Sequence, residues 1–117
     1  MHEPTLDEAQ ISALRSLDPD GSAGLLNVLF HEFSSQALTM VAQLEGARGD
    51  HDALAAAAHA HKGASASMGA KALASLLQQI EHAARAARPV EQEVFEQLPH
   101  VLEHTLGALS AALGLPR

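Results

Sequence analysis

Histidine gives this chain most of its capacity for chemistry, because eight of the 117 residues are histidine and none is cysteine. One histidine stands out for its spacing: His59 is followed by Lys62 three positions later and by Gly63 four positions later. At about 100° per residue these three positions share one face of a helix. Three isolated histidines are expected to be solvated: His31, His51 and His82. His2 is expected to lie in a frayed terminus.

The chemistry that fits this spacing is phosphoryl transfer to an imidazole. A histidine with an unperturbed pKa is largely neutral near pH 7 and is then a good nucleophile toward an activated phosphoryl group. Lys62 would supply positive charge for the phosphoryl oxygens, and Gly63 would leave room for a partner. Glycine inside a helix costs about 1 kcal/mol relative to alanine, so its presence asks for a reason. Spacing alone fits equally an alanine-rich helix that carries these residues by chance.

A second pair of histidines, His100 and His104, is spaced four residues apart and would share a helix face. Two imidazoles at this spacing make half of a zinc site. No third ligand is evident, since Glu103 is one residue off that face and Glu96 is only marginally on it. We therefore expect a solvated helix face here, with metal binding as the alternative.

Composition excludes several classes of protein. The chain has 7 Lys and Arg against 14 Asp and Glu, a formal charge of −7, which argues against binding to nucleic acid phosphates. Hydrophobic residues make up 47%, enough for a packed core rather than a disordered chain. The lack of cysteine excludes disulfides and thiolate metal sites. No segment has the pattern of a targeting signal or a membrane span, so we expect a cytoplasmic protein.

Hydrophobic spacing predicts an all-α fold without strands. A short first helix is expected to begin after the cap residue Thr5, with Glu8 as its capping-box partner, and to end at Asp18-Pro19. Pro99 is expected to bend or split the last helix. We predict a single domain over 1–117, an up-and-down antiparallel four-helix bundle capped by the short helix. The long helices are predicted after residue 22 to 46, from about 50 to 67, from about 70 to 87, and from 90 to 113.

The helix that carries His59 is expected to bury its opposite side. That side comprises Leu54, Ala57, His61, Ala64 and Met68. We expect His61 to be partly buried with a hydrogen-bond partner, and such a ring resists protonation. A docking surface around His59 is expected to include Ala55, Ala56 and Ala66. Ile11 and Leu14 would join it only if exposed, and we expect them to cap the core instead.

The segment from Ala58 to Ala70, AHAHKGASASMGA, resembles the signature of histidine-containing phosphotransfer (HPt) domains of multistep two-component phosphorelays. A leucine-rich stretch follows it, with Ile80-Glu81 and then Arg85. The resemblance covers about residues 17–88, whereas the last helix, about 90–113, is similar only in pattern. His61 departs from the family's usual leucine or phenylalanine, and Ala64 from a common serine.

The resemblance implies a role for each matching residue. His59 corresponds to the phosphoacceptor, and His61 does not, because only His59 has lysine at +3 and glycine at +4. Lys62 corresponds to the supporting lysine and Glu81 to a polar residue that orients the imidazole. Arg85 would help to hold the phosphoryl group or the partner. Gly69 corresponds to the glycine at the turn that follows.

The function implied is that of a phosphorelay intermediate and not of an enzyme. His59 would take a phosphoryl group from a receiver-domain aspartate and pass it to another. Partners would be receiver domains of response regulators or of a hybrid sensor histidine kinase, and Mg²⁺ would belong to the receiver. We expect a monomer without a cofactor of its own and without ATP binding, free in the cytoplasm or a cytoplasmic module of a membrane-bound kinase. The alternatives are an HPt-like scaffold or dimerisation module without transfer, and a helical metal-binding protein.

Overall fold

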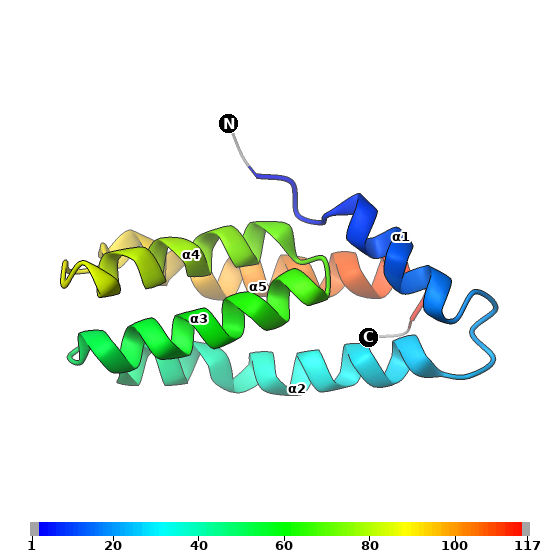
Figure 1. Ribbon diagram of the computed structural model, residues 1–117, viewed down its shortest axis with the longest axis horizontal. Coiled ribbons are helices and arrows are strands. Elements are labelled where there is room, and N and C mark those ends of the chain that lie inside the picture. Colours follow the sequence, from blue (N-terminus) through cyan, green and yellow to red (C-terminus); the bar gives the residue numbers. More distant parts are fainter. Residues whose placement is uncertain (1–2, 116–117) are drawn as a thin grey trace.

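The computed structural model describes residues 3–115, and these form five α-helices and no strand (Figure 1). The all-α prediction is confirmed, and each predicted helix end lies within two residues of the observed one. Within the described residues no helix is both long enough and apolar enough to span a bilayer. His2 lies outside the described residues. The helices are α1 (Glu8–Leu17), α2 (Leu25–Gly46), α3 (His51–Ser67), α4 (Lys71–Arg85) and α5 (Gln92–Leu113).

The start of α1 differs from the prediction, because Asp7 and not Thr5 caps the helix. The Asp7 carboxylate accepts a hydrogen bond from the backbone N–H of Gln10 at 3.2 Å. Thr5 lies outside the helix, where its carbonyl accepts from the N–H of Ala72 at 3.4 Å. Glu8 is already the first helical residue, so the predicted capping box cannot form. Aspartate is a strong N-cap, and it stands immediately before the first helical turn.

Gly69 fixes the N-terminal end of α1 against the turn between α3 and α4. Its φ of +75° is readily adopted by glycine, and its carbonyl accepts from the N–H of Asp7 at 2.8 Å. A Cβ at this position would lie 2.9 Å from the side chain of Ile11. Ile11 and Leu14 are buried, so they cap the core as expected and add nothing to a docking surface.

A buried aspartate organises the link from α1 to α2. Asp18 is 5% exposed, and its carboxylate accepts from the N–H groups of Ala23 at 3.2 Å and Leu25 at 3.0 Å. Free N–H groups at a helix start need such acceptors. The side chain of Asp18 therefore serves the first turn of α2 from seven residues upstream.

The core lies between the four long helices. Along it α3 packs against α4, α4 against α5, α5 against α2, and α2 against α3, while α1 packs against α2 and α5. Leucine, phenylalanine and methionine side chains fill most of this core, and small residues of α3 allow close packing. The buried residues of α3 are Leu54, Ala55, Ala58 and Ser65.

The buried face of α3 is rotated from the prediction. Ala55 is 5% exposed and therefore belongs to the core rather than to a docking surface. Ala57 and Ala64, predicted to face the core, are only half-buried. The side of α3 that carries Ala55 and Ala58 is the one that is most deeply buried, which turns the neighbouring His59 toward the edge of α4.

Pro99 lies within α5, which is one helix and not two. Pro99 itself is exposed, and large apolar residues are buried on both sides of it. Packing against a common core stabilises a helix more than local propensity does, which explains why the predicted split does not occur. The buried leucines of α5 are Leu98, Leu102, Leu106, Leu109 and Leu113.

Candidate functional site

His59 lies on α3 at the edge that faces α4, with 63% of its side chain exposed. Its Nδ1 is 3.0 Å from Oε2 of Glu81, which projects from α4. The Glu81 side chain is only 9% exposed. A buried carboxylate of the neighbouring helix thus contacts Nδ1 of an exposed ring.

This contact determines which nitrogen of the neutral ring can react. An ionised carboxylate can only accept, so Nδ1 must be the protonated nitrogen that donates to Glu81. The lone pair of the neutral ring then resides on Nε2. Within residues 3–115, Nε2 has no hydrogen-bond partner. The site therefore presents an unprotonated, accessible imidazole nitrogen.

Glu81 receives two further donors besides His59. Lys62 Nζ lies 2.6 Å from Oε1, and Arg85 Nε lies 2.8 Å from Oε2. The contact with Lys62 is the largest influence on the carboxyl and, with the hydrogen bonds of Arg85 and His59, lowers the pKa of Glu81 to about 2 against the opposing effect of burial. The carboxylate is therefore ionised throughout the neutral range and cannot take the proton from His59.

The two cations are placed differently beside the ring. Lys62 is only 29% exposed in its side chain and leans onto Glu81, whereas the prediction placed it on the solvent face. Arg85 is 57% exposed and uses only Nε for Glu81. Within residues 3–115 the other guanidinium nitrogens of Arg85 have no hydrogen-bond partner, so they can bind another anion. The ion pair of Lys62 was not predicted, because it depends on the distance between two helices.

Gly63 follows His59 by one helical turn and is exposed. A Cβ built at Gly63 would meet no atom within 4 Å. Packing within the chain therefore does not require glycine here, in contrast to Gly69. Exposed small residues surround the ring, and we call them the small-residue surface: Ala56, Ala60, Gly63 and Ala66. Ala56 and Ala66 were predicted members, whereas Ala60 was missed.

Comparison with known proteins assigns the family. Residues 24–115 match the model of the Hpt domain. The chain belongs to the Hpt domain family. The match includes α5, where sequence likeness was seen only as a pattern. The resemblance to histidine-containing phosphotransfer domains is thereby confirmed.

A solved structure is also similar to this Hpt domain. It is histidine-containing phosphotransfer protein B (HptB) from Pseudomonas aeruginosa PAO1, with 26% sequence identity and a TM-score of 0.79. The similarity covers 97% of this chain and 98% of that one. No curated protein matches the chain at a significant level.

His61 is another histidine of α3 in this Hpt domain, and its environment differs from that of His59. Its Nε2 lies 2.7 Å from Oε1 of Gln43, on α2. The ring is half-buried with a hydrogen-bond partner, as predicted, and burial lowers the pKa of His61. The hydrogen bond to the side-chain amide of Gln43 accommodates histidine at a position where the family usually has an apolar residue.

The histidine pair of α5 lies apart from this site. His100 and His104 are exposed beside a groove of about 520 Å³ that Gln97 and Thr105 also line. Within the described part of the chain, no three histidine or carboxylate side chains are grouped as a metal site requires. His31, His51 and His82 are exposed, as predicted for isolated histidines.

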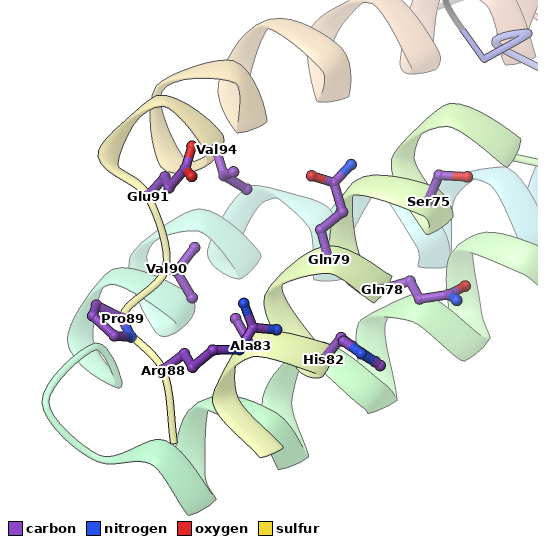
Figure 2. Close-up of a pocket in the computed structure, with 10 residues that line it drawn as sticks. All are labelled: Ser75, Gln78, Gln79, His82, Ala83, Arg88, Pro89, Val90, Glu91 and Val94. Carbon is purple, nitrogen blue, oxygen red and sulfur yellow. The ribbon is translucent and has the colours of Figure 1, made fainter. Parts of the chain in front are cut away.

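A larger groove of about 580 Å³ lies between the outer side of α4 and the start of α5 (Figure 2). The side chain of Arg88 extends from the linker toward Ala83 of α4. The backbone N–H of Arg88 donates to the carbonyl of Ala83 at 2.9 Å. Sequence reasoning missed this groove, because it forms only when the linker folds back on α4. Its lining mixes amide, hydroxyl, charged and apolar groups: Ser75, Gln78, Gln79, His82, Ala83, Arg88, Pro89, Val90, Glu91 and Val94.

Proposed function

We propose that this Hpt domain is a phosphorelay intermediate. Nε2 of His59 accepts a phosphoryl group from the aspartate of one receiver domain and later passes it to the aspartate of another. The single observation that carries this proposal is the hydrogen bond from His59 Nδ1 to Glu81, which leaves Nε2 unprotonated and exposed. The structural similarity to HptB, a histidine-containing phosphotransfer protein, supports the same role.

The transfer needs little from the chain beyond this nucleophile. Nε2 attacks the phosphorus atom, the N–P bond forms, and the P–O bond to the aspartate breaks. The electron pair of that bond leaves with the aspartate carboxylate, and no proton has to leave the ring. The ring then carries a positive charge next to Glu81. Arg85, and Lys62 if it turns from Glu81, provide positive charge for the phosphoryl oxygens.

The fold proposed for this role is an up-and-down antiparallel bundle of α2 to α5 with α1 as its cap. The packing of each long helix against its two neighbours supports it, as do the alternating helix directions in Figure 1. Such a bundle presents His59 on a rigid helix. The small-residue surface then lets a receiver approach Nε2 without steric clash.

The remaining chemistry is assigned to the partner. We propose that the receiver supplies Mg²⁺ and the acidic pocket, that this chain contributes no cofactor, and that it acts as a monomeric phosphocarrier rather than as a kinase. Partners are receiver domains of response regulators or of a hybrid sensor histidine kinase. This division explains why one nucleophile, one carboxylate and two cations are sufficient on the side of the Hpt domain.

The test is transfer from a receiver domain that carries a radiolabelled aspartyl phosphate. The wild type should gain label that is labile in acid and stable in base, as phosphohistidine is. His59→Gln should gain none while keeping its helical circular dichroism, and the matched control His100→Gln should behave as the wild type. Label on His59→Gln, or no label on the wild type from a broad panel of receivers, would overturn the proposal. The second result would favour a scaffold without transfer.

A further inference from the structure

The contact between His59 and Glu81 has a consequence for the phosphorylated state of the Hpt domain. Once Nε2 carries a phosphoryl group, the ring can leave in two forms. With the proton retained on Nδ1, the group that departs from phosphorus is a neutral imidazole. Without that proton it is an imidazolate anion, a far poorer leaving group. Transfer onward therefore depends on how firmly Nδ1 holds its proton.

The charged groups at this site favour the protonated ring. A phosphoryl group brings about two negative charges at neutral pH, and Glu81 adds one. Lys62 and Arg85 contribute one positive charge each. The site is neutral only when the ring is also positive. Among the described residues, α3 contributes His59 and Lys62 to the surroundings of Glu81, α4 contributes Arg85, and no group of α5 contacts its carboxylate.

Two features make Glu81 a fixed acceptor for that proton. Its side chain is 9% exposed, so water screens the contact with Nδ1 only weakly. Its other oxygen is held by Lys62 at 2.6 Å, which keeps the carboxylate ionised and oriented. The proton consequently stays on Nδ1 and does not move to Glu81. A neutral amide in the same place would leave the ring without a negative partner.

We propose that Glu81 retains the Nδ1 proton of phosphorylated His59, and that this chain therefore continues to pass on its phosphoryl group at alkaline pH. Glu81 acts here as a positioning residue, through the ring and not through phosphorus. The inference rests on the proposed function. An opposite charge at hydrogen-bond distance shifts a pKa by about one to three units, so the alkaline limit of transfer should move by at least about one pH unit when the charge is removed.

The experiment loads the full chain with phosphoramidate and then follows the transfer of phosphoryl groups to a receiver domain between pH 6 and pH 10. Wild type, Glu81→Gln and the exposed control Glu96→Gln are compared. Dividing each rate constant by that of the wild type removes the pH dependence of the receiver. The ratio for Glu81→Gln should fall about tenfold or more from pH 6 to pH 9, and the ratio for Glu96→Gln should stay constant.

A measurement on the wild type alone covers the case in which Glu81→Gln does not fold. Nitrogen-15 shifts of phosphorylated His59 report the protonation of Nδ1, which should persist at least one pH unit above that of a phosphohistidine peptide. A flat ratio for Glu81→Gln, or deprotonation at the pH of the peptide, overturns this inference and leaves the proposed function intact. A wild type that cannot be loaded by phosphoramidate or by any receiver overturns both.

Discussion

His59 and His61 are two residues apart on α3, yet they lie on different sides of the helix and have different surroundings. His59 faces the edge of α4, is largely exposed, and uses Nδ1 to contact the carboxylate of Glu81. His61 faces α2, is half-buried, and uses Nε2 to contact the amide of Gln43. The first ring keeps Nε2 open to solvent. The second ring has the same atom engaged.

The difference shows that the reactivity of a histidine depends on which group contacts the ring and on which nitrogen it contacts. A buried carboxylate fixes the proton on Nδ1 of His59 and leaves Nε2 open. At His61 the amide of Gln43 contacts Nε2 instead, and burial lowers the pKa of that ring. Exposure alone does not single out His59, because His31 and His51 are exposed as well.

The largest expected effect separates the two histidines directly. His59→Gln should lose phosphoryl acceptance completely, and His61→Gln should retain most of it, because the reactive Nε2 belongs to His59 alone. Initial rates of labelling from a phosphorylated receiver measure both. Phosphoryl acceptance by His59→Gln, together with loss of acceptance in His61→Gln, would show that His61 is the reactive histidine.

Removing the cation beside His59 should have the next largest effect. Lys62→Ala should slow transfer about tenfold to a hundredfold. Loss of one fixed donor in an enzyme site slows the reaction about a hundredfold or more, and the effect here should be no larger because Lys62 is partly solvated. Lys71→Ala, an exposed lysine at the start of α4, is the control and should leave the rate unchanged. Equal rates for the wild type and Lys62→Ala would assign the supporting charge to Arg85.

Gly63 tests whether the His59 side of α3 is kept clear for a partner. Gly63→Ala should raise the free energy of unfolding by about 0.5–1 kcal/mol, because no internal contact opposes the added methyl group. Gly63→Leu should fold and yet bind receivers poorly. Urea denaturation and receiver titration measure the two effects. Unchanged transfer by Gly63→Leu would remove the steric reason for glycine.

Acid stability gives the smallest effect and concerns the His61 side. Because burial lowers the pKa of folded His61, the unfolded chain binds the proton first as the pH falls below about 6.5. Stability must then fall as the pH falls. The wild type should lose more stability than His61→Leu between pH 7.5 and pH 5, as measured by urea denaturation. An equal or greater loss in His61→Leu would show that His61 is not buried enough to resist charging.

Much of the fold was predictable, because leucines at helical spacing and the Pro and Gly breaks define the helices. The stripe of Leu73, Leu76, Leu77 and Ile80 is buried as its periodicity predicts. Alanine gave no such signal. It is compatible with either side of a helix, so Ala55 was assigned to the surface although it is buried.

The site was predictable only in part. Spacing placed His59 and Gly63 on one exposed face, and the family resemblance pointed to Glu81 and Arg85. The contacts of Glu81 with His59 and Lys62 could not be read from sequence, because they depend on how α3 packs against α4. Arg85, by contrast, follows Glu81 by four residues on the same helix. The N-cap of α1 was also missed, since Thr5 and Asp7 are both good caps and the sequence alone does not rank them.

The most direct test of the proposed chemistry is to locate the phosphoryl group on the ring. Phosphorus and nitrogen NMR of the phosphorylated, nitrogen-15-labelled chain distinguish the two ring nitrogens of each histidine. We predict a single phosphoryl group on Nε2 of His59, with the proton on Nδ1 next to Glu81. A phosphoryl group on Nδ1, or on His61, would contradict this prediction.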